Sequence, residues 1–158
     1  MAGRLLILVA TLGATALAAT SGWAAPTAAA CRPTASQGPG PFERNRAAAP
    51  FRSRIGRGHV LIGRVLRYPD CAPLRNATVE LWQESPNGQY DQRGHARVRT
   101  DKTGTFRFEG PVPPGEFGRS PHIHLRVTAG PYDEVVLTYF IRSGERQGRL
   151  TVVLTSSL

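Results

Sequence analysis

Short apolar runs separated by turn residues recur along the second part of the chain, and their spacing constrains the fold more than any other feature. No segment keeps a helical spacing of apolar residues over several turns. Regularly spaced short runs are typical of β-sandwiches and barrels. The runs occupy residues 60–66, 77–83, 95–100, 105–109, 122–128, 135–141 and 150–155. We therefore predict an all-β protein with about seven to nine strands.

Composition supports a turn-rich β protein. The chain has 158 residues, which leaves room for one domain. It contains 17 Gly and 13 Pro, too many for a helical bundle. Because 41% of the residues are apolar and the glycines and prolines are scattered, collagen and a disordered tail are also excluded.

Alternation within the runs assigns side chains to the two faces of each strand. Phe106 and Phe108 share one face, so both are expected in the core. Val79 and Leu81 likewise share a face. Trp82 falls on the opposite face, where it either forms a second packing layer or walls a site.

The N-terminal residues have the three parts of a secretory signal peptide. Arg4 precedes an uncharged apolar segment, Leu5–Ala19, which small residues follow. That segment is shorter than the ~20 residues of a membrane-spanning helix, and no other segment is long enough. We predict a signal peptide over residues 1–24, cleaved near Ala24 or Ala30. The mature protein is then secreted or periplasmic and does not span a membrane; an uncleaved anchor is the alternative.

An extended arm is predicted between the signal and the domain. The segment from Pro26 to Pro50 is rich in Ala, Pro, Gly, Arg and Ser, with Phe42 as its single large apolar residue. The arm is assigned to residues 25–54 and the β-sandwich domain to residues 55–158.

Only two cysteines are present, Cys31 in the arm and Cys71 in a turn. They are too few for a disulfide-rich scaffold or a four-cysteine zinc site, so nitrogen and oxygen atoms would hold most of any metal. In an oxidising compartment the two are natural disulfide partners. Two unrelated free thiols are the alternative.

The chain is strongly basic. Lys and Arg total 20 against 11 Asp and Glu, which gives a net charge of +9, and Lys102 is the single lysine. The arginines are spread through strands and loops rather than interleaved with aromatics, so we do not expect a nucleic-acid partner. One local cluster is either a solvated arm or a contact for an anionic envelope polymer: Arg44, Arg46, Arg52, Arg54 and Arg57.

Two histidines are candidates for metal binding. On a strand, His122 and His124 project from one face while Ile123 and Leu125 face the core. Two imidazoles on one face can hold a metal ion. A His-x-His pair by itself is equally typical of a solvated strand face.

Several strings in one order resemble a known family. They are "VELWQ", "NGQY", "TDKTGTFRF" and "GRSPHIH", preceded by "CRPTASQGPGPF" in the arm. Together they are similar to the intradiol ring-cleavage dioxygenases, the group with protocatechuate 3,4-dioxygenase and catechol 1,2-dioxygenase, over roughly Cys31 to Ile141. The resemblance implies a prealbumin-like β-sandwich that holds one ferric ion, Fe(III), through two tyrosines and two histidines. It also implies oxidation of a catechol-type aromatic with O2, a reaction of aromatic-compound catabolism.

The resemblance also assigns residues. Tyr90 matches the first tyrosine ligand, His122 and His124 match the histidine pair, and Arg119 matches the arginine beside the substrate. Phenolate is a hard anionic donor that favours Fe(III), and a ferric centre can withdraw charge from a bound catecholate. A guanidinium beside the ring would stabilise the negative charge that develops there.

The chain departs from the family where the second tyrosine belongs. The loop of residues 113–118 contains no tyrosine, and either Glu116 or Phe117 takes its position. Glu116 could be a carboxylate ligand and a base, whereas Phe117 could only wall the substrate pocket. Trp82 and Gln83 are expected to lie near the metal and complete that pocket.

The chain also offers little pocket wall, since the segment after Tyr90 is short. The site is therefore expected either to be open or to be completed in a homo-oligomer. One alternative stays open, a non-catalytic sandwich of the same family that binds a metal, an aromatic or an envelope polymer. A transthyretin-like sandwich without a metal, in which the histidine pair is incidental, is disfavoured because it gives no reason for Tyr90, Arg119 and the two histidines to occur together in the family's order.

Overall fold

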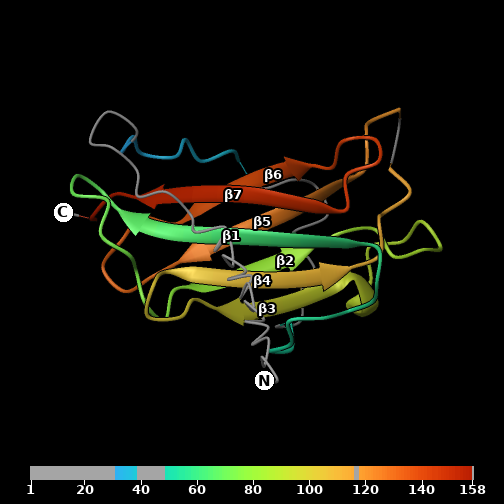
Figure 1. Ribbon diagram of the computed structural model, residues 1–158, viewed down its shortest axis with the longest axis horizontal. Helices are drawn as coiled ribbons and strands as arrows, with labels where there is room; N and C mark the ends of the chain where they lie inside the picture. The colour runs from blue at the N-terminus through green and yellow to red at the C-terminus, as the bar shows by residue number, and fades with distance from the viewer. Residues whose placement is uncertain (1–30, 39–48, 116–117, 158) are drawn as a thin grey trace, which may run out of the picture.

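The computed structural model describes residues 31–38, 49–115 and 118–157. Two β-sheets lie face to face (Figure 1). The elements are β1 (His59–Arg67), β2 (Thr78–Trp82), the short 3-10 turn η3 (Gln92–Gly94), β3 (His95–Arg99), β4 (Thr105–Gly110), β5 (His122–Thr128), β6 (Val135–Phe140) and β7 (Gln147–Leu154). The all-β sandwich prediction is confirmed, and each predicted run overlaps one strand. In the described ranges, no helix is long and apolar enough to cross a membrane.

One sheet has three strands in the order β4-β1-β7, and the other has four in the order β3-β2-β5-β6. Neighbouring strands are antiparallel except β1 and β7, which run parallel. β2 and β5 are thus the central pair of the four-stranded sheet. Side chains on their outer faces are flanked by β3 on one side and β6 on the other.

The core lies between the sheets and follows the predicted alternation. Phe106 and Phe108 of β4 are buried, as are Val79 and Leu81 of β2. Burying a side chain of this size contributes about 1.5–3 kcal/mol relative to leaving it in water. Since the inward positions are filled by apolar residues, the polar residues of β2 and β5 are left on the outer face of their sheet.

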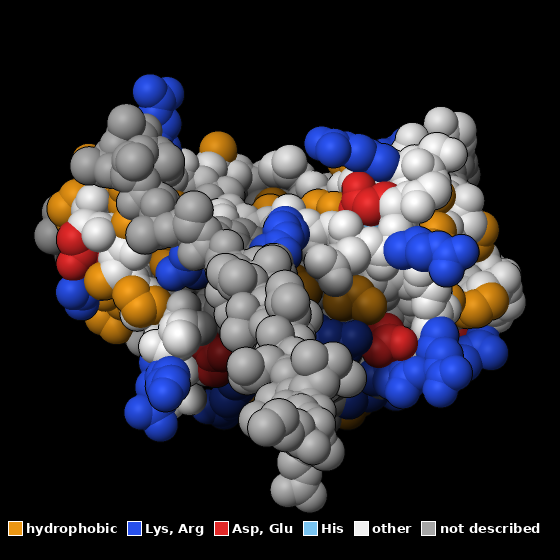
Figure 2. Space-filling model, viewed as in Figure 1, with side chains coloured by type: hydrophobic (Ala, Val, Ile, Leu, Met, Phe, Trp, Pro, Cys, Tyr) orange, Lys and Arg blue, Asp and Glu red, His pale blue; other side chains and the backbone are white. Residues whose placement is uncertain are grey.

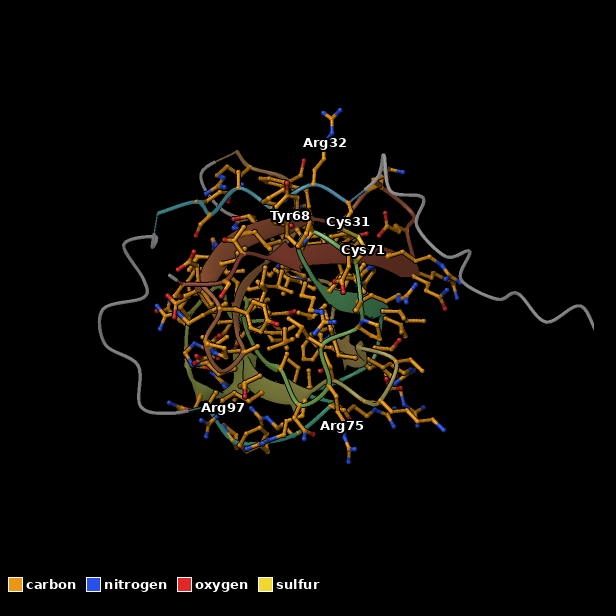
Figure 3. All side chains as sticks on the ribbon, turned by 90° about the vertical axis from the view of Figure 1, so that its left-hand side faces the viewer. Cys31, Arg32, Tyr68, Cys71, Arg75 and Arg97 are labelled. Atoms are coloured by element: carbon orange, nitrogen blue, oxygen red, sulfur yellow. A yellow bond between two sulfur atoms is a disulfide. The ribbon has the colours of Figure 1, made fainter. Side chains whose placement is uncertain are left out.

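Residues 31–38 lie beside the last two strands. The amide of Thr34 donates to the carbonyl of Val153 at 2.9 Å, and the amide of Gln37 donates to that of Val136 at 2.7 Å. A disulfide joins Cys31 to Cys71 (Figure 3). The predicted signal peptide lies outside the described residues, and the predicted domain boundary at residue 55 stays a prediction.

Removing the disulfide should lower the stability of the fold substantially. The bond spans 40 residues, and in the chain-entropy model a crosslink of that length contributes about 4 kcal/mol by restricting the unfolded chain. We expect the Cys31→Ser/Cys71→Ser protein to lose up to about that much unfolding free energy in urea titrations. Reduction of the native protein should give the same loss, and an unchanged urea midpoint in both samples would contradict the estimate.

Candidate metal centre

Tyr90, His122 and His124 converge on the outer face of the four-stranded sheet. The Tyr90 hydroxyl lies 3.4 Å from His122 Nε2 and 3.5 Å from His124 Nε2. The two imidazoles stand edge to face, with ring centroids 4.8 Å apart. The structure therefore brings together three of the residues predicted as metal ligands, two from β5 and one from the loop between β2 and η3; metal binding by them stays a prediction.

The three donor atoms fit a shared metal ion better than a hydrogen-bonded cluster. An O–H···N hydrogen bond is usually about 2.7–3.0 Å long, shorter than either separation here. Two ligands with bonds of about 2.0–2.1 Å to one ion, at a near-tetrahedral angle, lie about 3.4 Å apart. A phenol oxygen and two imidazole nitrogens are also a donor set that suits a hard, high-valent first-row metal such as Fe(III).

The Nδ1 atoms of His122 and His124 make contacts that orient both imidazole rings. His122 Nδ1 is 2.9 Å from the carbonyl oxygen of Ser120, which can only accept, so Nδ1 carries the proton and Nε2 keeps its lone pair. His124 Nδ1 lies 3.3 Å from the Thr138 hydroxyl. Fixing a ligand histidine through its other nitrogen is the usual arrangement around protein-bound metals.

His124 is neutral under ordinary conditions. Burial, followed by the electrostatic effects of His122 and Arg119, lowers the pKa of the His124 imidazole to about 4. Above that pH, one of the two ring nitrogens of His124 carries no proton and has a free lone pair. The environment thus keeps His124 in the form that binds metals.

Trp82 backs the centre. Its ring stacks on His124 with centroids 5.2 Å apart and an interplanar angle of 16°, and Trp82 is only 1% exposed. Trp82 was predicted to form either a second packing layer or the wall of a site, and its burial against His124 is that of a packing layer. Gln83 is also fully buried, and its Nε2 donates to the carbonyl of Pro111 at 2.8 Å. Substrate contact by Trp82 and Gln83 stays a prediction.

A tightly closed loop delivers Tyr90. The amide of Gln83 donates to the carbonyl of Gly94 at 3.1 Å, and a Cβ at Gly94 would lie 2.1 Å from the carbonyl oxygen of Gln83. Only glycine permits this approach of η3 to the end of β2. The close approach holds together the two ends of the loop between Gln83 and Gly94, and Tyr90 lies within that loop.

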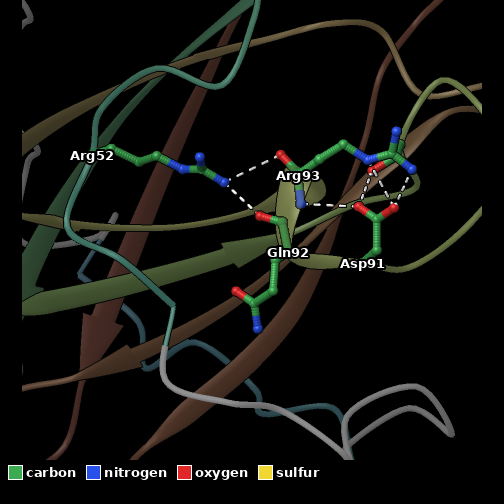
Figure 4. Close-up of polar contacts among 5 residues, drawn as sticks. Arg52, Asp91, Gln92 and Arg93 are labelled. Atoms are coloured by element: carbon green, nitrogen blue, oxygen red, sulfur yellow. Dashed lines mark hydrogen bonds and ion pairs between the residues drawn. The ribbon is translucent and has the colours of Figure 1, made fainter.

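Asp91 holds the residues that follow Tyr90. It accepts from the Ser85 hydroxyl at 2.6 Å and from the amide and Nε of Arg93, both at 2.9 Å. Arg52 reaches from the arm to the carbonyls of Gln92 and Arg93 (Figure 4). Hydrogen bonds to Asp91 in the loop and from Arg52 in the arm therefore hold the η3 turn in place.

Arg119 lies beside the centre. Its guanidinium carbon is 5.5 Å from the ring centroid of Phe140, and Phe140 is the strand partner of His122, with 5.6 Å between their rings. Phe140 is 47% exposed. Arg119 and the partly exposed ring of Phe140 thus border the centre on the side of His122.

The remaining tyrosines do not supply a second phenolate. All four tyrosines are in the described ranges, and three of them lie away from the centre. Tyr139 Oη contacts Glu145, with the pKa of Tyr139 raised to about 12 by burial and by that carboxylate. Tyr132 follows β5 at the far end of the sheet and pairs with Ser156. Tyr68 is exposed in the turn after β1.

Glu116 and Phe117 lie outside the described residues, so their assignments stay predictions. In residues 31–38, 49–115 and 118–157, no three His, Cys, Asp or Glu side chains gather as a metal site, at this cluster or at any other place. Among these described residues, the candidate centre consists of two histidines and a tyrosine.

Replacing Asp91 by Asn should destabilise the Tyr90 loop in a pH-dependent way. Arg93, and then Ser85, hold the pKa of Asp91 well below its usual range. A lowered carboxyl pKa stabilises the fold above the ordinary value of about 3.9, and that contribution is lost as the pH falls. We expect Asp91→Asn to lower unfolding free energy at pH 7 by at most about 1 kcal/mol, since the group is partly exposed.

Urea unfolding at several pH values checks this expectation. The difference between wild type and Asp91→Asn should shrink steadily as the pH falls below about 3.9, and it should vanish only once the pH is below the lowered pKa of the folded protein. A difference that does not change with pH would mean that the carboxylate charge is not what holds the loop.

The sequence did not predict four residues that contact the histidines or hold the Tyr90 loop: Ser120, Thr138, Phe140 and Asp91. The register of β5 against β6 pairs His122 with Phe140 and His124 with Thr138. That register is invisible without the sheet order. Asp91 had a local signal, because an aspartate two residues before Arg93 at a turn is a typical cap.

Proteins of known function with similar sequences include ring-cleaving dioxygenases. No family model matches the chain. Chlorocatechol 1,2-dioxygenases of Cupriavidus pinatubonensis and of Burkholderia cepacia are each 24% identical to it. Each match covers 54% of this chain and 44% of the enzyme, so the chain spans less than half the length of these curated relatives.

Solved structures share the fold. The dioxygenase domain of a dioxygenase and carbohydrate-binding protein fusion from Streptomyces sp. SirexAA-E superposes with a TM-score of 0.68 at 21% identity, over 79% of this chain and 99% of that chain. Hydroxyquinol 1,2-dioxygenase from Pseudomonas putida DLL-E4 gives 0.65 at 18% identity, over 78% and 67%. In sequence and in fold the chain is therefore similar to intradiol dioxygenases, and the resemblance drawn from its motifs is confirmed.

Proposed function

We propose that this chain, which resembles the intradiol ring-cleavage dioxygenases, is an exported Fe(III)-dependent dioxygenase that opens the ring of a catechol-type aromatic with O2. The observation that carries the proposal is the convergence of the Tyr90 oxygen with the Nε2 atoms of His122 and His124. Export rests on the signal-like segment of residues 1–24.

Tyr90, His122 and His124 would hold the metal. A ferric ion bound by them would withdraw electron density from a coordinated catecholate, which makes a ring carbon reactive toward O2. Tyr90 would supply the anionic oxygen that favours the ferric state. Ser120 and Thr138 would keep both imidazole lone pairs directed at one point, and buried Trp82 would exclude water behind His124.

Arg119 would act on the substrate. Its positive charge lies near enough to the centre to lower the pKa of His124. A guanidinium in that place stabilises negative charge on a bound ring more strongly as the charge grows. The exposed ring of Phe140, which Arg119 overlies, gives the planar guanidinium a surface to pack on.

The substrate hydroxyl protons need an acceptor. Tyr90 is the one tyrosine at the centre, so the second tyrosinate of the family has no equivalent among the four tyrosines of this chain. Glu116 is the proposed acceptor, because a carboxylate can take up a proton and can also bind a metal.

Glu116→Gln and Phe117→Leu should separate these two neighbours. We expect Glu116→Gln to weaken iron binding more than Phe117→Leu does, because only the first change removes a negative donor. Iron content after dialysis against a chelator measures this. Equal retention of iron in both variants would remove Glu116 from the centre.

The proposed activity is tested with iron-loaded protein, a catechol and O2. We expect oxygen uptake and one ring-opened dicarboxylic acid per O2 consumed, with both oxygen atoms in the product. A metal-free sample is the control. Iron-loaded protein that binds catechols without consuming oxygen would instead support the non-catalytic sandwich.

A further inference from the structure

An arginine-lined groove lies where the edges of the two sheets meet at β3 and β4. Its volume is about 570 Å3, and its lining includes Phe51 with Arg52, Arg97, Arg99 and Arg107. Among the described residues that line it, none is acidic. Figure 2 shows Lys and Arg side chains gathered along the lower edge of that view, where Figure 1 places β3 and β4.

An aromatic ring organises the groove. The guanidinium carbons of Arg97 and Arg99 lie 4.5 Å and 5.0 Å from the ring centroid of Phe51. Phe51 is nevertheless 52% exposed. A guanidinium that lies over an aromatic ring keeps its edge, with its N–H donors, available to another group. The ring therefore holds two cations at the surface, and their N–H donors that are not used within the protein can reach a ligand.

The backbone below this ring is fixed. Arg52 donates to the carbonyl of His95 at 2.7 Å and 3.0 Å, and the amide of Arg97 donates to the carbonyl of Pro50 at 2.9 Å. Arg97 Nε also donates to the carbonyl of Ala49. Because these bonds tie residues 49–52 to β3, the groove is preformed and a ligand does not have to order it.

The positive charges of the groove are arranged in a row along β3 and β4. Arg97 and Arg99 are two residues apart on β3, so their Cα atoms lie about 6.6–6.8 Å apart along the strand. Arg107 extends the row onto β4, where Glu109 bonds it at 3.1 Å at the margin of the groove. A row of planar, bidentate donors matches a linear polymer with a carboxylate on successive units.

We propose that this groove binds an acidic polysaccharide, a polymer of uronic acids, through Arg99, Arg107 and the arginines beside them. The proposed export of the chain places it among such extracellular polymers. A nucleic acid fits less well, because single-stranded nucleic acids are bound by bases stacked on open aromatic rings, and the Phe51 ring already carries guanidinium groups. The groove is separate from the metal centre, so the proposal does not depend on ring cleavage.

The test compares two charge-matched variants. Arg99→Gln/Arg107→Gln removes two charges from the groove. Arg32→Gln/Arg146→Gln removes two exposed charges that do not line the groove, and Figure 3 shows Arg32 on the opposite side of the molecule from Arg97. Calorimetric titration with oligogalacturonate measures affinity, with dextran as the uncharged polymer and single-stranded DNA as the competing polyanion.

We expect Arg99→Gln/Arg107→Gln to weaken oligogalacturonate binding about tenfold, from two lost charged contacts of about 0.7 kcal/mol each, and the matched control to change it less than about twofold. Phe51→Leu keeps the net charge and should still weaken binding about threefold, because the ring no longer holds the guanidinium groups. Binding should also fall as salt is raised.

Three results would overturn the proposal: no binding of oligogalacturonate by wild type, equal weakening by the two double variants, or tighter binding of DNA than of oligogalacturonate. Circular dichroism checks that each variant is folded. Since Phe51→Leu changes no charge, its affinity alone separates a built groove from attraction by net charge.

Discussion

Tyr90→Phe should abolish the visible colour of the iron-loaded protein. The substitution removes one oxygen atom, the one that lies 3.4 Å and 3.5 Å from the two imidazole nitrogens. A phenolate-to-iron charge-transfer band needs that oxygen. Iron affinity should also fall by at least about 10²-fold, since loss of an outer-shell partner alone costs about 10–100-fold.

Tyr132→Phe is the matched control for this change. It removes the same atom from a tyrosine at the far end of the sheet, whose backbone pairs with that of Ser156. Colour and iron content should be unchanged. If the Tyr90→Phe protein stays coloured and fully loaded with iron, Tyr90 is not a ligand and the assignment is wrong.

Arg119→Gln should nearly stop turnover while leaving the metal bound. Arg119 contributes no donor atom to the convergent set, so iron content and colour should persist. Removal of one group that stabilises developing charge lowers kcat by about 10²–10³-fold. Steady-state oxygen uptake with saturating catechol measures kcat, and visible absorption measures the iron.

Arg119→Lys tests whether charge or shape matters. Lysine keeps the charge but loses the flat guanidinium that lies over the Phe140 ring, so we expect only partial recovery of kcat. If Arg119→Gln keeps wild-type kcat, the arginine does not act on the reacting ring. If it loses iron, its role is structural.

Local patterns were enough to predict the strands and which side chains face the core. Phe106 and Phe108 alternate with polar residues, and β4 buries both. The parallel pairing of β1 with β7 could not be predicted in this way. It joins the two ends of the domain, and no local spacing reports which distant strands become neighbours.

The candidate site was predicted to a similar depth. The histidine pair follows from strand alternation, and Tyr90 follows from the family resemblance. The residues that contact the histidines could not be predicted, because Thr138 and Phe140 become their neighbours only through the register of β5 and β6. Trp82 shows the same limit: alternation gave its face, and the structure shows that it stacks on His124.

The non-catalytic alternative differs from the proposed enzyme in the second anionic group. A centre with Tyr90 as its one tyrosinate could bind iron and still be unable to accept a substrate proton. The Glu116 comparison and the oxygen-uptake assay test that difference separately. The transthyretin-like alternative without a metal predicts neither colour nor iron uptake.

The central claim is that Tyr90, His122 and His124 form an Fe(III) centre with a position open to a catechol. The most direct test is the visible absorption spectrum of the Fe(III)-loaded protein, recorded without oxygen before and after addition of catechol. We predict a phenolate-to-iron band that shifts when the catechol binds. A colourless protein that takes up no iron would contradict the claim.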